Sequence, residues 1–283
     1  MEQLDHGDPR TVGSYTVSAR LGVGTTGTVY LARSATGRPV ALKVVHPALT
    51  EDETFPLRLQ AAFTAARHVS WMSTTPVLDA DPNARPPWVA TAFVAGVPLS
   101  RAVEQCGPLP EPVLIALVRE LAVALLTVHG AGTVHRGVAP AKVLLAADRP
   151  HLLERSVVAQ AALGATPPAA FLAPEQTQAR SVTAAADMFS LGSTIYYAAT
   201  GRAPFGGPAD ELPTRIAKAS PVLGFLPPGL AELIGACLAK DPNARATARQ
   251  VLDFVQQRAP APLAEGWMPP ALSAEIAAQT LAG

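Results

Sequence analysis

The residues best placed to do chemistry early in the chain are three glycines and a lysine. Gly22, Gly24 and Gly27 follow the G-x-G-x-x-G spacing, which lets backbone amides approach a phosphate group. On their own, glycines at this spacing are often only the turn residues of a hairpin. Lys43 follows in the run VALKVV, on what we expect to be the next strand, where its ammonium can bind phosphate. Together the four residues indicate a site for the phosphates of a nucleotide.

The elements that must position these residues are short strands followed by helices. Residues 15–45 contain alternating or apolar runs separated by glycine, which is typical of an antiparallel sheet. A helix is predicted over 54–70, and two further strands are expected on either side of a turn at 81–83. Two more helices are then predicted, over 98–105 and over 110–130, and the second ends at a glycine.

Composition narrows the class of protein. The 283 residues are enough for one two-lobed domain with a sizeable core. Because 22 basic residues balance 22 acidic ones, no nucleic-acid footprint or polybasic membrane patch is indicated. The N-terminal stretch is acidic and polar, unlike a signal peptide, and the longest apolar stretch is interrupted by Arg119 and Glu120, so we expect no membrane span. Cys106 and Cys237 lie far apart and are expected to be reduced thiols of a cytoplasmic protein.

Further motifs follow in a definite order. The run VHRGVAPAKVLL occupies 134–145, FLAPEQ contains Ala173-Pro174-Glu175, and the helical stretches beyond them contain Asp187 and Arg245. With the glycines and the lysine, this order resembles the eukaryotic-like serine/threonine protein kinases of bacteria, and their actinobacterial members in particular. The resemblance covers nearly all of the chain, from about Tyr15 to Gln257.

The resemblance implies an α+β, bilobal protein-kinase-like fold, with a small antiparallel-sheet N-lobe and a mostly helical C-lobe. We expect the N-lobe over 12–95, the C-lobe over 96–258, and a proline-rich and then helical tail over 259–283. Trp267 and Met268 either dock this tail on the large lobe or belong to a loosely attached end, and both alternatives stay open.

The resemblance also implies which polar residues are architectural. In the family, the residue corresponding to Asp187 holds the backbone of the His135-Arg136 loop. Glu175 of the Ala-Pro-Glu motif corresponds to the acid that pairs with Arg245. We therefore expect both contacts here.

By the same resemblance, a nucleotide would be bound by residues of both lobes. Thr91 corresponds to the gatekeeper, and 92–94 to the hinge whose backbone meets adenine. The residues expected to line an ATP site are Leu21, Gly22, Gly24, Gly27, Val29, Ala41, Lys43, Thr91, Ala92, Val94 and Leu144.

The chain departs from the family where the family keeps its chemistry. In the pattern H-R-D-x-x-x-x-N, Asp accepts the proton of the substrate hydroxyl and Asn holds a magnesium ion. Here Gly137 replaces the Asp, Lys142 replaces the Asn, and Ala139 replaces the catalytic-loop Lys. The helix over 54–70 contains no acidic residue, and Ala62 stands about where the family's Glu pairs with the strand Lys.

The metal-binding Asp-Phe-Gly triplet is missing as well. Alignment on Leu152-Leu153 places Glu154 at the Asp position, and a slip of one residue would place Arg155 there. We favour Glu154, because strand patterns are more dependable than loop lengths. In either register the Asp is absent.

These losses predict a pseudokinase, a catalytically inactive member of the family that acts in signalling as a scaffold or allosteric regulator through protein partners. An atypical phosphoryl or nucleotidyl transferase with Glu154 as metal ligand is the alternative, and a nucleotide sensor without chemistry is a third hypothesis. ATP binding is left open, and bound Mg²⁺ is not expected. For the cleft, one hypothesis is a salt bridge between Lys142 and Glu154 that neutralises the site. Metal-independent ATP binding to Lys43 and Lys142 is a sharper variant, and an emptied cleft with unrelated surface charges is the plain alternative.

Overall fold

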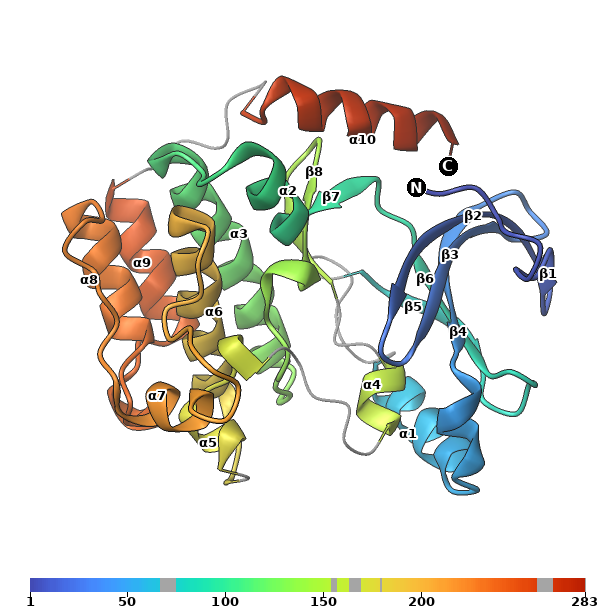
Figure 1. The fold of residues 1–283 in the computed structure, drawn as a ribbon, viewed down its shortest axis with the longest axis horizontal. Coiled ribbons are helices and arrows are strands. Elements are labelled where there is room, and N and C mark those ends of the chain that lie inside the picture. Colours follow the sequence, from blue (N-terminus) through green and yellow to red (C-terminus); the bar gives the residue numbers. More distant parts are fainter. Residues whose placement is uncertain (67–74, 154–156, 163–168, 179, 259–266, 283) are drawn as a thin grey trace. The chain divides into compact units, whose positions relative to one another are not determined.

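A computed structural model of the chain shows two compact units, whose elements are labelled in Figure 1. The small unit contains residues 1–95, 154–165 and 276–283, and the large unit contains residues 96–153 and 166–275. The structure describes residues 1–66, 75–153, 157–162, 169–178, 180–258 and 267–282. One unit is rich in strands and the other is mostly helical, as the predicted α+β fold requires.

The small unit is built on a six-stranded antiparallel sheet with the strand order β1-β2-β3-β4-β6-β5. Its strands are β1 (Thr11–Val12), β2 (Tyr15–Gly24), β3 (Gly27–Arg33), β4 (Pro39–Val45), β5 (Val77–Asp81) and β6 (Trp88–Ala92). The antiparallel sheet predicted over 15–45 and the two strands around the 81–83 turn are therefore confirmed.

Side chains alternate along these strands and give the sheet two different faces. One face buries a cluster made of Tyr15, Val17, Tyr30, Ala32, Val40, Leu42, Trp88 and Ala90. The other face carries Val45 and Val89, which pack with helix α1 (Phe55–Ala66). Lys43 is two residues from Val45 and opposite Val89 in the ladder, so it belongs to this second face.

Helix α1 has a helical neighbour in the small unit. The 3₁₀-helix η1 (Pro47–Glu51) precedes it, and the short helix α4 (Val157–Ala161) packs against it. The helix predicted over 54–70 agrees with α1 as far as the structure describes it, because residues 67–70 lie outside the described part. Helix α4 was not predicted.

The large unit is dominated by helices. They are α2 (Leu99–Cys106), α3 (Glu111–Gly130), α5 (Pro174–Thr177), α6 (Ala184–Thr200), α7 (Leu212–Lys218), α8 (Pro228–Cys237), α9 (Ala248–Arg258), the first part of α10 (Pro270–Ala282), and the 3₁₀ turns η2 (Pro140–Lys142), η3 (Ala169–Phe171) and η4 (Pro242–Ala244). Helix α3 packs against α6 and α9, and α6 packs against α8. By length and composition α3 alone among the described helices could cross a membrane, but more than half of its apolar stretch is buried in the unit, as expected of a core helix.

Two glycines shape the central helix of this unit. A Cβ on Gly192 would lie 2.7 Å from the Cβ of Cys237, so glycine allows α6 and α8 to approach closely. Gly201 ends α6 in the left-handed conformation, with φ of 73°, and donates its backbone N–H to the carbonyl of Tyr197.

A second, three-stranded sheet carries the central loop of the large unit. Its strands β7 (Gly96–Pro98), β8 (Val143–Ala146) and β9 (Pro150–Leu152) pair antiparallel in the order β7-β8-β9. Turn η2 leads directly into β8, and the backbone N–H of Leu153 donates to the carbonyl of Lys142 at 2.7 Å. The residues expected to hold the chemistry therefore flank this sheet.

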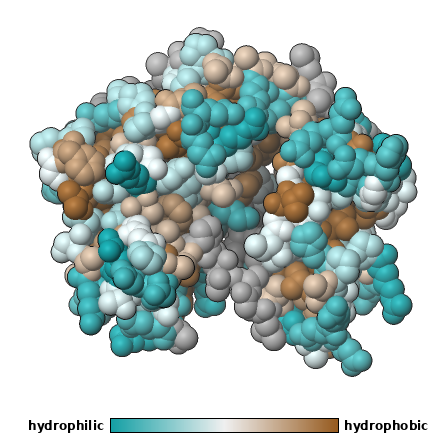
Figure 2. Space-filling model, viewed as in Figure 1, coloured by the Kyte–Doolittle hydropathy of each residue, from teal (hydrophilic) through white to brown (hydrophobic). Residues whose placement is uncertain are grey.

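The tail is docked where the structure describes it. Met268 and Leu272 are buried, and within the large unit Arg101 of α2 forms an ion pair with Glu275 at 2.9 Å. Of the two alternatives for the tail, the docked one describes this part, and α10 begins at Pro270 rather than at the predicted 272. On the face shown in Figure 2, hydrophilic and hydrophobic residues are intermingled over both units.

Candidate functional site

The predicted phosphate-binding glycines form the end of the β2–β3 hairpin. Gly24 pairs with Gly27, and Gly22 lies opposite Val29. At Gly27 the backbone has φ of 157°, and an added Cβ would lie 2.2 Å from the carbonyl oxygen of Val44. Only glycine fits this close approach of the hairpin to β4.

Lys43 is tied to the same hairpin. It lies on β4 opposite Val29, and its ammonium donates to the hydroxyl of Thr26 at 2.5 Å. Thr26 is buried between the two glycines of the turn. The lysine expected to bind phosphate is thus positioned by the hairpin that carries the glycines, an arrangement that the sequence analysis did not identify.

Helix α1 offers Lys43 no carboxylate. None of its residues is acidic, and Ala62 packs against the apolar cluster that includes Val45 and Val89. The position expected to hold a Glu is therefore a half-buried alanine that packs against the small unit's core.

The residues predicted to meet adenine are divided between the two units. Leu21, Val29, Ala41, Thr91, Ala92 and Val94 are half-buried residues of the small unit, whereas Leu144, also half-buried, lies on β8 of the large unit. Ala41 and Thr91 are directly opposite on β4 and β6, and the Thr91 hydroxyl donates to the Ala41 carbonyl at 3.3 Å. Within the small unit the structure thus brings Gly22, Val29, Ala41, Lys43 and Thr91 onto one face of the sheet.

In the large unit a completely buried carboxylate holds the central loop. Asp187 accepts hydrogen bonds from the backbone N–H groups of His135, at 2.7 Å, and Arg136, at 2.6 Å. His129 Nε2 lies 2.9 Å from the same carboxylate. Arg136 has φ of 60°, which is uncommon for a residue other than glycine. The two hydrogen bonds from the backbone amides to Asp187 hold the loop in that conformation. The predicted role of Asp187 matches this geometry.

The positions at which the family carries its catalytic-loop residues follow directly after His135 and Arg136. Gly137 and Ala139 are buried, and neither presents a polar side chain. Lys142 ends turn η2, and burial lowers the pKa of its ammonium. Magnesium prefers oxygen ligands, and the side chain of Lys142 supplies none, so position 142 does not fit the family's metal site.

The backbone of Leu153, the last described residue before position 154, is fixed by two hydrogen bonds. Its carbonyl lies 2.9 Å from Nε2 of His135, and its N–H donates to Lys142. Glu154 and Arg155, the two candidates for the missing Asp, lie outside the described residues, and so does the expected contact between Glu154 and Lys142.

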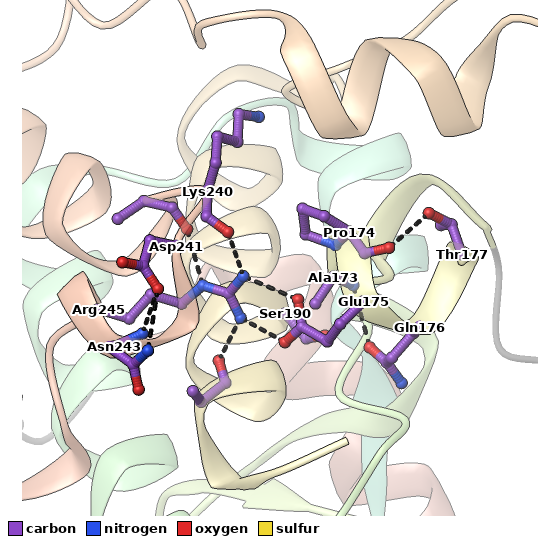
Figure 3. A network of polar contacts seen from close by, with 12 residues as sticks. Ala173, Pro174, Glu175, Gln176, Thr177, Ser190, Lys240, Asp241, Asn243 and Arg245 are labelled. Carbon is purple, nitrogen blue, oxygen red and sulfur yellow. Dashed lines mark hydrogen bonds and ion pairs between the residues drawn. The ribbon is translucent and has the colours of Figure 1, made fainter. Parts of the chain in front are cut away.

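A second buried network ties the Ala-Pro-Glu motif to the rest of the large unit (Figure 3). Arg245 donates to both carboxylate oxygens of Glu175, at 2.6 and 2.9 Å. Its other N–H groups donate to the carbonyls of Ala185, Ala239 and Lys240. Both charged side chains are almost completely buried, so the expected pair is present with every guanidinium donor used.

Comparison with known proteins agrees with this geometry. The sequence model of the family described as "Protein kinase domain" matches residues 15–255. The chain belongs to the protein kinase family. The earlier resemblance is thereby confirmed at the level of family and fold.

Three curated relatives indicate the branch of the family to which the chain is similar. The chain is 43% identical over 279 residues to serine/threonine-protein kinase AfsK of Streptomyces griseus, covering 94% of this chain and 34% of that protein. It is 39% identical over 284 residues to the probable serine/threonine-protein kinase PkwA of Thermomonospora curvata, covering 96% of this chain and 38% of that protein. To PknL of Mycobacterium tuberculosis it is 30% identical over 246 residues, with 82% and 62% covered. The chain spans a little over a third of the length of the first two relatives.

Two features of the site escaped the sequence analysis. Helix α4 had a weak signal, the mostly apolar run 157–162, which is too short to distinguish a helix from a strand. The contact of Thr26 with Lys43 had none, because it joins the turn of the β2–β3 hairpin to strand β4. Across the described ranges, no group of three or more His, Cys, Asp or Glu residues gathers as a metal site would require.

Proposed function

We propose that this chain is a pseudokinase that acts through protein contacts, as a scaffold or as an allosteric partner of an enzyme. The observation that carries the proposal is a contrast within one unit. The architectural networks around Asp187 and Arg245 are complete, whereas the base position is Gly137 and the metal position is Lys142. The residues that stabilise the fold are therefore kept, whereas the residues that the family uses for catalysis are replaced.

Magnitudes support a loss of phosphoryl transfer. Kinases turn over at roughly 1–100 per second, and loss of a general base costs about 10²–10⁴-fold. Removal of the base alone would leave one event in seconds to hours. Loss of a magnesium ligand comes in addition, although such effects do not simply multiply.

Nucleotide binding is a separate part of the proposal. We propose that ATP, where it binds, does so weakly and without metal. The support is that the glycine hairpin and Lys43 are held as a phosphate site would need, while Lys142 would bring a positive charge where a metal ligand is expected. In its protonated form Lys142 would repel Mg²⁺ and attract phosphate, although burial lowers the pKa of its ammonium. A nucleotide sensor without chemistry is consistent with the same features.

A transfer assay tests the central claim. The chain is incubated with radiolabelled ATP, Mg²⁺ or Mn²⁺, a generic protein substrate and itself, beside the restored variant Gly137→Asp/Lys142→Asn. We expect no label transfer above background by the natural chain. Label transfer that disappears in Glu154→Gln would overturn the proposal in favour of the atypical transferase.

A thermal-shift titration tests the nucleotide claim. We expect a small rise in melting temperature with ATP that Mg²⁺ does not increase. In the Lys142→Asn variant, an oxygen ligand is restored and the rise should become larger with Mg²⁺ present. Strong magnesium-dependent binding by the natural chain would contradict metal-free binding.

A further inference from the structure

Thr26 lies at the tip of the glycine hairpin, and its side chain is buried. It stands in the two-residue turn between Gly24 and Gly27 and is only 4% exposed, whereas its neighbour Thr25 is exposed. The turn of a hairpin normally lies at the surface. The burial of one of two adjacent threonines therefore means that another part of the small unit covers Thr26.

The side chain of Lys43 provides part of this cover. Its ammonium donates to the Thr26 hydroxyl at 2.5 Å, and the contact joins residues 17 positions apart. A hydrogen bond with a charged donor is stronger than one between neutral groups. Because an ammonium is strongly hydrated, the hydroxyl also takes the place of a water molecule that would otherwise solvate the charge.

His46, directly after β4, binds the same turn at two points. Its backbone N–H donates to the carbonyl of Thr26 at 3.2 Å, and Nε2 of its ring lies 2.9 Å from the carbonyl oxygen of Gly24. Next to these contacts Gly27 pairs with Val45 in the sheet. Backbone and side-chain contacts from the end of β4 therefore hold the tip of the hairpin in place.

A phosphate group bound by both the glycine hairpin and Lys43 must lie between them. In this structure the Thr26 hydroxyl already joins the two. The hydroxyl is a neutral acceptor, whereas a phosphate offers several charged oxygens, so a di- or triphosphate can displace it at the cost of the bond that is lost. A nucleoside without phosphate makes no demand on the ammonium and leaves this contact intact.

We infer that Thr26 is an internal ligand of Lys43, which keeps the phosphate site closed until a di- or triphosphate displaces its hydroxyl. The closed hairpin belongs to the chain without nucleotide and goes beyond the proposed function. Its consequence, that ATP binds weakly, rests on the nucleotide binding proposed above. The contact itself is therefore tested first, in the absence of any nucleotide.

Reductive methylation of the full chain, followed by peptide mass spectrometry, measures how accessible the Lys43 amine is. Thr26→Val keeps the shape of the side chain and removes the acceptor, Thr26→Ser keeps the hydroxyl, and Thr25→Val makes the same change at the exposed neighbour. We expect methylation of Lys43 to become about fivefold faster in Thr26→Val and to stay within about twofold in the other two variants. Equal rates in Thr26→Val and Thr25→Val would overturn the inference.

Hydrogen–deuterium exchange gives a second measurement that does not depend on the lysine amine. The N–H of His46 donates to the carbonyl of Thr26, so its exchange reports opening of the hairpin tip. Exchange should be faster in Thr26→Val and in Lys43→Met, which breaks the contact from the other side, and unchanged in Thr25→Val. If Thr26→Val also exposes the amides of β3 and β4, it has unfolded the sheet, and Lys43→Met decides.

Calorimetric titration with adenosine, ADP and ATP, without Mg²⁺, tests the consequence for ligands. Thr26→Val should bind ADP and ATP about five- to tenfold more tightly than the natural chain and bind adenosine equally. An unchanged ATP affinity, or an equal gain for adenosine, would overturn the inference. If no variant binds any nucleotide, the proposed nucleotide binding fails by itself, and the methylation and exchange rates decide whether Thr26 holds Lys43.

Discussion

Replacement of Arg245 by methionine removes a guanidinium that donates five hydrogen bonds inside the large unit. The carboxylate of Glu175 would be left buried without a cation, and three backbone carbonyls would lose a donor. Removal of one partner from a buried ion pair costs about 3–5 kcal/mol. A domain has about 5–15 kcal/mol of stability in total. We therefore expect this variant to lose about a fifth or more of the free energy of unfolding.

Urea unfolding followed by circular dichroism measures this loss. With a slope of about 2–3 kcal/mol per molar, the midpoint should fall by about 1–2.5 M. Arg249→Ala is the matched control, because Arg249 is an exposed arginine of the neighbouring helix α9 and should change stability by less than about 0.5 kcal/mol.

A double variant divides the loss between its causes. Glu175→Leu together with Arg245→Met removes the stranded carboxylate but still leaves the three carbonyls unmet. We expect it to recover part of the stability and not all of it. The reasoning would be refuted if Arg245→Met unfolded within about 1 kcal/mol of Arg249→Ala, since the buried network would then contribute nothing measurable.

Three further predictions concern single positions. Asp187→Asn leaves one oxygen for the two backbone amides of the central loop, so we expect a loss of about 2 kcal/mol or more in urea unfolding; a change below about 0.5 kcal/mol would contradict the proposed role. Gly27→Ala forces a Cβ to within 2.2 Å of the Val44 carbonyl, so the melting temperature should fall and the ATP-induced shift should disappear; an unchanged melting curve would contradict this. Cys237 is buried, and burial raises the pKa of its thiol to about 12. At pH 8 a thiol reagent should therefore label the exposed Cys106 and react with Cys237 only after unfolding. Because the unfolded thiol has a pKa near 9.0, the unfolded state loses its proton first, and stability should fall between about pH 9 and 12 more steeply in the natural chain than in Cys237→Ala.

Local chemistry explains why much of the fold was predictable. The turn at 81–83 forms because the carboxylate of Asp81 accepts from the backbone N–H groups of Asn83 and Ala84, all within four residues. Helix α3 was predicted to within a residue, because its apolar pattern extends over 20 residues. Local hydrogen bonds and periodic apolar patterns of this kind can be predicted from a short stretch of sequence.

Helix α4 and the tail were less predictable, since their stability comes from elsewhere in the chain. The Arg58–Ala161 hydrogen bond joins residues 103 positions apart, and no sequence pattern within 157–161 predicts it. The burial of Met268 and Leu272 likewise depends on the surface on which they dock, so the sequence left two alternatives for the tail.

The sequence by itself determined which residue types stand at the chemical positions, because Gly137 and Lys142 could be read from motif spacing alone. The tertiary structure alone decided their surroundings. It brought Asp187 to the amides of His135 and Arg136, buried Lys142 so that the pKa of its ammonium falls, and placed Ala62 against an apolar cluster. The physical reason is that spacing fixes identity within a short stretch, whereas burial and partners depend on chain segments that meet only when the protein folds.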